Sequence, residues 1–214
     1  MQLEIFSDIV CPWCFVGKRR LDELLATDAG EGVSLRWRPY QLRPTIPPGG
    51  IDRHEYLAQR YGDAADPARG PSRVVEEAAT VGLALDYGAI GRIPNTTLAH
   101  RVMEAAFATG DAAAQHDLAD ALFAAYFCEG RDVESPEVLG SCLSAVGLDA
   151  TLVDALLIDD VYADDLQAQR ERAIDLGISG VPNLVFAGTF SLPGVQSLDS
   201  LQQIFERART RLGD

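Results

Sequence analysis

The 214-residue sequence has few positive charges and only one lysine, Lys18. Its 18 Lys and Arg residues stand against 32 Asp and Glu, which gives a formal net charge of −14 at pH 7. A surface of this sign repels the phosphates of nucleic acids and the headgroups of anionic membranes. We therefore expect neither nucleic acid nor membrane among the partners of this protein.

Long hydrophobic runs are also missing. No stretch approaches the roughly 18 uninterrupted apolar residues of a membrane span, and no basic segment followed by an apolar one marks a secretory signal. We therefore expect a cytoplasmic protein. Disorder requires low hydrophobicity together with high net charge. With 47% hydrophobic residues the first condition fails, so the chain is expected to bury a substantial core.

Cysteine is scarce, with four residues at Cys11, Cys14, Cys128 and Cys142. A reducing cytosol disfavours a structural disulfide framework, so two cysteines separated by two residues indicate redox chemistry or a metal site. Zinc would need a second pair of ligands, but Cys128 and Cys142 are 14 positions apart and the three histidines are scattered. We expect no metal. For Cys11 and Cys14, packed core cysteines or a stable disulfide remain alternatives. We expect Cys128 and Cys142 to be buried and inert, with a second redox pair as the alternative.

Apolar spacing predicts a strand–helix–strand unit at the start of the chain. Residues 2–10 and 33–40 have the composition of strands, and residues 12–27 have helical spacing. Such a unit is expected to be a right-handed parallel βαβ crossover. A turn-rich stretch follows at residues 44–50.

The rest of the chain divides into a helical block and a second α/β part. Helices are predicted at 52–61, 71–82, 96–109, 111–127, 135–146, 149–158, 160–176 and 197–212, and strands at 183–187 and 189–192. We therefore predict one α/β domain, formed by residues 1–45 and 160–214, with residues 46–159 inserted as a helical subdomain.

The motif Cys11-Pro12-Trp13-Cys14 lies where the first strand should meet its helix. A helix N-terminus offers unpaired N–H groups and the positive end of the helix dipole, both of which favour a thiolate over a thiol. The thiolate is the attacking species in disulfide exchange. Cys11 is therefore predicted to be the nucleophile, and Cys14, about one turn later, to be the resolving thiol. Trp13 adds bulk but no charge next to the pair.

The dipeptide Val181-Pro182 opens the strand that would lie beside the first one. X-Pro bonds adopt the cis form at modest cost. A cis proline facing the thiols would leave the Val181 backbone free to pair with an extended substrate. We therefore predict that Val181, Pro182 and Trp13 contact substrate, with an ordinary trans proline in a turn as the alternative.

Several segments resemble the DsbA-like thioredoxin-fold family, in its cytosolic FrnE-type branch. The similarity spans nearly the whole chain and rests on residues 7–19, 37–42, 95–101, 125–130, 177–182 and 194–196. It implies a thioredoxin fold with a central mixed four-stranded sheet and an inserted helical domain. It also implies dithiol–disulfide oxidoreductase activity, with Cys11 as nucleophile, Cys14 as resolving thiol and Pro182 in cis. A sister group contains 2-hydroxychromene-2-carboxylate isomerases and kappa-class glutathione transferases. In that group serine usually holds the position of Cys11, which argues against this branch.

The leading prediction is thus an oxidoreductase acting on protein or small-molecule disulfides, by reduction or isomerisation in a reducing cytosol. No cofactor is required, although glutathione or a thioredoxin-type protein would serve as reductant. Two alternatives stay open: a glutathione-dependent isomerase or transferase for an aromatic or polyketide-like compound, and a redox-sensing binding module without turnover. Asp8 and Glu4 are candidate acceptors for the Cys14 proton, with solvated carboxylates as the alternative. His100 is a weaker candidate for a site role.

Overall fold

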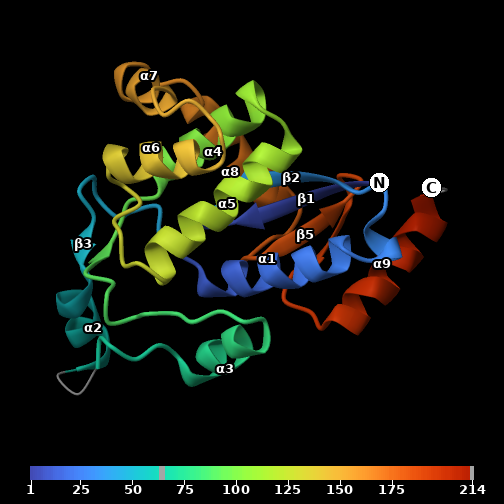
Figure 1. The fold of residues 1–214 in the computed structure, drawn as a ribbon, viewed down its shortest axis with the longest axis horizontal. Coiled ribbons are helices and arrows are strands. Elements are labelled where there is room, and N and C mark those ends of the chain that lie inside the picture. Colours follow the sequence, from blue (N-terminus) through green and yellow to red (C-terminus); the bar gives the residue numbers. More distant parts are fainter. Residues whose placement is uncertain (63–65, 213–214) are drawn as a thin grey trace.

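The computed structural model describes residues 1–62 and 66–212 and has a mixed four-stranded sheet at its centre (Figure 1). The strand order is β2-β1-β5-β6, with β1 at Gln2–Ser7, β2 at Ser34–Pro39, β5 at Asn183–Phe186 and β6 at Phe190–Pro193. Strands β1 and β2 are parallel, and the other neighbours are antiparallel. The predicted thioredoxin-type sheet is confirmed.

Helices cover both faces of this sheet because β1 is apolar on both. Leu3 and Ile5 belong to the main core together with α1 (Pro12–Leu25) and α9 (Leu198–Leu212). Phe6 points to the opposite face, where it packs with Ala173 of α8 (Ala163–Asp175). The side chains of a strand alternate between faces, so this pattern fixes the register of the central strand. Because β1 and β2 are parallel, their carboxyl ends lie at the same edge of the sheet.

The segment between β2 and α8 is mainly helical and lies over one side of the sheet (Figure 1). Its elements in chain order are β3 (Ile51–Asp52), α2 (Arg53–Tyr61), α3 (Ser72–Thr80), β4 (Arg92–Ile93), α4 (Thr97–Thr109), α5 (Ala112–Phe127), α6 (Pro136–Ala145) and α7 (Leu152–Ile158). A short 3-10 helix at Asp28–Gly30 precedes β2.

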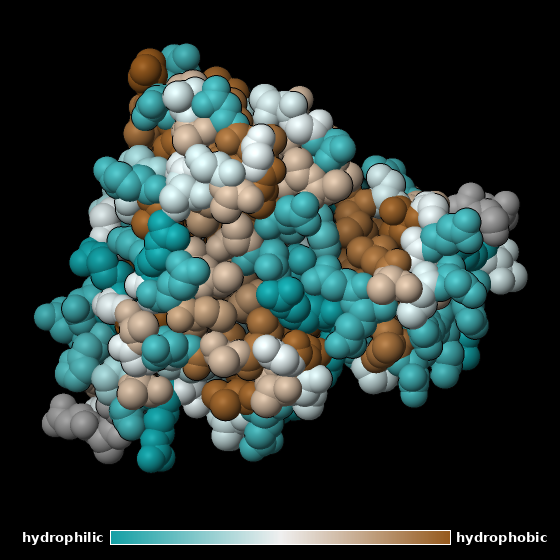
Figure 2. Space-filling view, viewed as in Figure 1, coloured by the Kyte–Doolittle hydropathy of each residue, from teal (hydrophilic) through white to brown (hydrophobic). Residues whose placement is uncertain are grey.

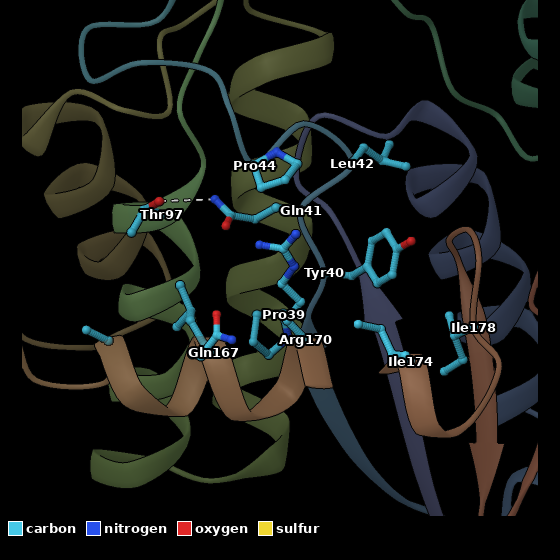
Figure 3. Close-up of a pocket in the computed structure, with 12 residues that line it drawn as sticks. Pro39, Tyr40, Gln41, Leu42, Pro44, Thr97, Gln167, Arg170, Ile174 and Ile178 are labelled. Carbon is cyan, nitrogen blue, oxygen red and sulfur yellow. Dashed lines mark hydrogen bonds between the residues drawn. The ribbon is translucent and has the colours of Figure 1, made fainter. Parts of the chain in front are cut away.

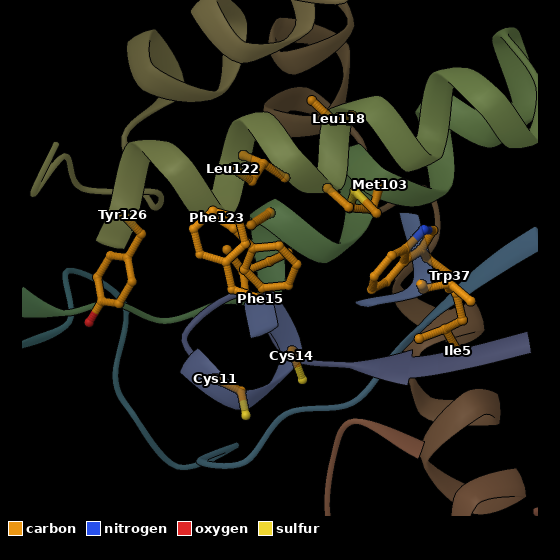
Figure 4. Packing of buried hydrophobic residues seen from close by; sticks show 14 of the residues in the cluster. Ile5, Cys11, Cys14, Phe15, Trp37, Met103, Leu118, Leu122, Phe123 and Tyr126 are labelled. Atoms are coloured by element: carbon orange, nitrogen blue, oxygen red, sulfur yellow. The ribbon is translucent and has the colours of Figure 1, made fainter. Parts of the chain in front are cut away.

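The helical segment shares its core with the sheet. The ring of Phe15 in α1 stacks on Phe123 and Phe127 of α5 at centroid distances of 5.3 and 6.3 Å (Figure 4). The buried side chain of Gln115 in α5 accepts the Trp37 backbone N–H of β2 at 2.9 Å. The first helix of the fold is therefore covered by the inserted residues, and one continuous apolar cluster spans both parts.

Two details differ from the sequence predictions. The first strand ends at Ser7, because the Cys11 N–H donates to the Asp8 carbonyl at 3.0 Å and turns the chain before the helix. The Asp8 carboxylate also accepts the Leu42 N–H at 2.8 Å, a contact made across 34 residues. The two-residue strands β3 and β4, which pair antiparallel, lie in segments that the sequence predicted as helix and loop.

The face shown in Figure 2 is mixed, with hydrophilic and apolar side chains interspersed. On α7, Leu157 and Ile158 are 55% and 82% exposed. No helix within the described residues is both long and apolar enough to cross a bilayer. The same part of the chain contains no group of three or more His, Cys, Asp or Glu side chains arranged to hold a metal ion.

Candidate active site

The two cysteines of the motif lie at the N-terminus of α1, as predicted. Cys11 is the residue before the helix and has an extended backbone, and Pro12 takes the first helical position, where its missing N–H leaves no gap. The Cys11 carbonyl accepts the Cys14 N–H at 2.9 Å. Both sulfurs are free thiols, Cys11 is 3% exposed and Cys14 is fully buried. Figure 4 shows both sulfurs pointing to the same side of the helix.

The predicted substrate-facing loop meets the first thiol. Cys11 Sγ donates to the Val181 carbonyl at 3.6 Å, across 170 residues. The Val181–Pro182 peptide bond is cis, as the family resemblance implied. Trp13, Val181 and Pro182 line a common surface cavity of about 430 Å³. Its other walls come from Gly177, Ser179, Gly180, Asn183, Ser191, Leu192, Pro193 and Val195. The structure thus brings together all five residues that the sequence singled out.

Pro182 is held between two glycines. A Cβ built at Gly17 of α1 would lie 3.1 Å from Pro182 Cγ, and one built at Gly194 would lie 3.2 Å from Pro182 Cβ. Any side chain at either position would press on the proline next to the thiols. Sequence reasoning gave neither glycine a role. The available signal was Gly17 itself, because glycine inside a helix costs about 1 kcal/mol relative to alanine and so suggests a packing reason.

Burial dominates the environment of the second thiol. It raises the pKa of Cys14 well above the ordinary value, and the neighbouring Cys11 sulfur raises it further. The Ser7 hydroxyl and the Asp8 backbone N–H act in the opposite direction because they stabilise the thiolate. The buried position of Cys14 therefore disfavours its thiolate form.

Of the two carboxylates considered for that role, Glu4 is already engaged. Burial alone would raise the pKa of Glu4, but hydrogen bonds and charges from Arg172 and Arg38 outweigh it and keep the pKa below the ordinary value. Arg172 Nη1 donates to Glu4 Oε1 at 2.7 Å, and Arg38 Nε donates to the same oxygen at 2.7 Å. Glu4 is therefore held in ion pairs with two arginines, which makes its carboxylate a poor proton acceptor.

Asp8 lies in a different setting, next to His100 of α4. Asp8 Oδ1 and His100 Nε2 are 3.3 Å apart, and the two residues are 1% and 3% exposed. Neither atom has an aligned hydrogen-bond partner within the described residues, and the same holds for Ser7 Oγ and Glu104 Oε1. Ser7, His100 and Glu104 line a cavity of about 10 Å³, enough for roughly one water molecule. Buried polar atoms without partners are rare, and this group is connected to Cys14 through Ser7 and Asp8.

Cys128 and Cys142 lie away from this centre. Cys142 Sγ donates to the Ala121 carbonyl at 3.8 Å, and burial raises the pKa of both thiols. Both are free cysteines, Cys142 buried and Cys128 partly buried. Their predicted inertness stays a prediction.

A second cavity of about 480 Å³ lies between the segment after β2 and helix α8 (Figure 3). Arg170 of α8 extends into it toward Tyr40 and Gln41. Most of the remaining wall is apolar, including Leu42, Pro44, Ile174 and Ile178, and Thr97 and Gln167 add polar groups. The sequence predictions did not include this cavity.

Comparison with known proteins identifies a family that matches nearly the whole chain. Residues 2–206 match the DSBA-like thioredoxin domain family. A Streptomyces coelicolor crystal structure described as a probable DsbA oxidoreductase is 31% identical, covering 97% of this chain and 89% of that one with a TM-score of 0.83. The uncharacterised Bacillus subtilis protein YwbO is 26% identical over 216 residues, 97% of this chain and 95% of that protein.

A more distant structure shares the fold. The cytosolic disulfide reductase DsbM from Pseudomonas aeruginosa, solved with GSH, is 16% identical with a TM-score of 0.64, covering 97% of this chain and 98% of that one. The family model matches nearly the entire chain. The thiol pair at a helix N-terminus, next to a cis-proline loop on a mixed four-stranded sheet, agrees with this match. The chain belongs to the DSBA-like thioredoxin domain family and is an enzyme of the thiol-oxidoreductase type.

Proposed function

We propose that this protein is a thiol–disulfide oxidoreductase that exchanges disulfides through Cys11 and Cys14. The observation that carries the proposal is the position of Cys11 Sγ, at the N-terminus of α1 and 3.6 Å from the Val181 carbonyl. A helix N-terminus stabilises a thiolate there, and the neighbouring loop offers a backbone that pairs with an extended substrate. The cavity beside Trp13 gives that substrate a place to lie.

The proposed reaction follows from the different positions of the two sulfurs: Cys11 lies at the N-terminus of α1 beside the Val181 carbonyl, and Cys14 lies about one turn later and is fully buried. The Cys11 thiolate attacks a substrate disulfide, forming one S–S bond and releasing the first substrate thiolate, which takes up a proton. Cys14 then loses its proton and attacks Cys11 Sγ, forming the Cys11–Cys14 disulfide and releasing the second thiolate. The substrate gains two electrons and the protein dithiol loses two. A thiol reductant such as glutathione, or a thioredoxin-type protein, returns Cys11 and Cys14 to dithiols in the cytoplasm.

Replacement of Cys14 by serine tests this order of events. We expect Cys14→Ser to form a mixed disulfide between Cys11 and substrate that persists, because the only nucleophile adjacent to it is gone. Intact-protein mass spectrometry after incubation with a peptide disulfide should show the adduct, and thiol-reversible loss of its mass should identify the bond. Cys142→Ser, which also removes a buried thiol, is the matched control and should release its substrate normally. Equal release by Cys14→Ser and wild type would refute the assignment.

We further propose that Asp8 and His100 accept the proton of Cys14. The Ser7 hydroxyl and the Asp8 N–H reach that sulfur, and the cavity of about 10 Å³ joins Ser7 to His100. Glu104 lies at the same cavity, and burial raises its pKa despite the opposing charges of Arg36 and Arg38. The charges of Asp165 and His100 also reach Glu104. A base in this place makes the shielded thiol reactive near neutral pH.

Removing the imidazole should slow the second step without affecting the first. We expect His100→Gln to release the second substrate thiol on the order of 10²-fold more slowly at pH 7. Its rate should rise steadily with pH as hydroxide replaces the missing base. Stopped-flow measurement of thiol release separates the two steps. His116→Gln is the control, since His116 instead accepts the Trp37 indole N–H and pairs with Asp22. Identical pH profiles for folded His100→Gln and wild type would show that the proton leaves by another route.

A further inference from the structure

We propose that the cavity between the segment after β2 and helix α8 binds a carboxylate on the arm of the disulfide substrate, through Arg170. This inference rests on the proposed function, because it names the chemistry of a substrate for the same thiols. It assigns the cavity of about 480 Å³ to an acidic, partly apolar arm, such as a short peptide with an acidic residue near its cysteine.

Arg170 is an exposed, unpaired cation at the wall of this cavity. The guanidinium makes no hydrogen bond or ion pair with any described residue, whereas Arg172, two positions later, donates to both oxygens of Glu4. The acidic side chain adjacent to it in sequence is also occupied, since Glu171 Oε1 accepts from Gln167 at 2.9 Å. A planar guanidinium with five free donors fits a carboxylate bidentately.

The walls carry no opposing charge. None of the twelve residues that line the cavity is acidic, in a chain with 32 Asp and Glu. The polar groups nearby are held in place: Gln41 Nε2 donates to Thr97 Oγ1 at 3.0 Å (Figure 3). An anion is therefore attracted to Arg170 at this cavity, whose neutral wall does not oppose it. The rest of the surface, in a protein of net charge −14, repels anions.

An apolar cluster connects the cavity wall to the loop beside Cys11. Tyr40 and Ile178 line the cavity, and both belong to the small cluster around Phe6 that also contains Val181. The Val181 carbonyl accepts the Cys11 thiol. The Tyr40 N–H donates to the Ser7 carbonyl at 3.0 Å, which ties the cavity wall to the end of β1 just ahead of the motif. In this proposal, an extended arm bound at Cys11 runs along this edge of the sheet toward the cavity.

The apolar residues of the cavity wall indicate that the ligand also has an apolar part. Leu42 and Ile174 are 43% and 68% exposed, and Pro44 lines the same cavity near Gln41. Ligand sites of roughly 300–1,000 Å³ combine such apolar walls with a few polar groups that set orientation. A carboxylate on an apolar arm satisfies both features, and a highly charged phosphate ligand would leave the apolar wall unused.

The test compares acidic and neutral arms on otherwise identical substrates. Mixed disulfides of 2-mercaptoethanol with capped peptides would carry Glu or Gln one, two or three residues from the cysteine. For at least one spacing we expect wild type to show a lower KM for the Glu peptide. Arg170→Glu should raise that KM about tenfold, the scale of a charged hydrogen bond, and leave the Gln peptide and kcat unchanged. Rising salt should weaken the preference.

Arg207→Glu makes the same change of charge on the exposed side of α9 and should leave both KM values unchanged. Peptides with Ala in place of Cys provide a readout without chemistry: calorimetric binding of the Glu peptide should be lost in Arg170→Glu. If wild type does not turn over any disulfide but this binding difference persists, the proposed function fails and the subsite stands. If no spacing distinguishes Glu from Gln in either assay, or Arg170→Glu weakens both equally, the subsite is refuted.

Discussion

Replacing Cys11 by serine is expected to abolish disulfide turnover. The serine hydroxyl fits the same space at the helix N-terminus, but it stays protonated at neutral pH and forms no exchangeable bond to sulfur. Loss of a covalent nucleophile typically costs at least about 10³-fold in rate. Insulin reduction with glutathione or dithiothreitol as electron source measures this loss, and the rate should fall to that of the reductant alone.

The contrast with the remaining cysteines makes the result specific. Cys128→Ser changes a partly buried thiol that lies at the end of α5, away from the cis-proline loop. It should keep the wild-type rate, and the buried Cys142→Ser should do so within the limits of its stability. Circular dichroism must show that Cys11→Ser is folded. Full insulin-reducing activity in folded Cys11→Ser would remove the basis of the mechanism.

Gly130→Ala is expected to cause the largest loss of stability. Gly130 has φ +64° just after α5, and a Cβ there would lie 2.2 Å from the Ala89 carbonyl oxygen. The left-handed backbone costs an alanine about 1–2 kcal/mol, and forcing an atom into packed backbone adds roughly 1–3 kcal/mol. The free energy of unfolding should therefore fall by about 2–5 kcal/mol. For a chain of this length the melting temperature drops by about 2–4 °C per kcal/mol.

Gly147→Ala separates these two costs. Gly147 ends α6 with φ +77°, and a Cβ there meets no atom within 4 Å. Its substitution should show the backbone cost alone, so chemical denaturation of the two variants isolates the clash at Ala89. Equal losses in both variants would mean that the loop carrying Ala89 moves aside without penalty.

Most elements could be predicted because their signals are local. Ser135 and Pro136 illustrate this: the predicted cap is confirmed, with Ser135 Oγ accepting the Val138 N–H and Pro136 at the first helical position. Cys11 and Pro182 were predicted in the same way, since a proline fixes where α1 begins and another marks the loop before β5. The apolar and aromatic residues near the start of the chain likewise predicted the first strand.

Features that depend on contacts between distant segments could not be read from the sequence. The turn at Asp8 depends on Leu42, and the room for Pro182 depends on Gly17 and Gly194. Arg170 is no different in type from the chain's other arginines until the fold shows that it lines a cavity between two distant segments without an ion-pair partner among the described residues. A single sequence gives residue types and spacing, while such pairings arise from the three-dimensional path of the chain.

The stacking of Phe15 against Phe123 and Phe127 bears on how this protein can be engineered. Because Phe15 directly follows the second thiol, excising the helical segment to obtain a minimal redox domain would expose a wide aromatic surface on the helix that carries the dithiol. Such a truncation should aggregate, and grafting the motif onto a smaller scaffold would need a substitute for α5. The two parts of the chain should accordingly melt in a single calorimetric transition.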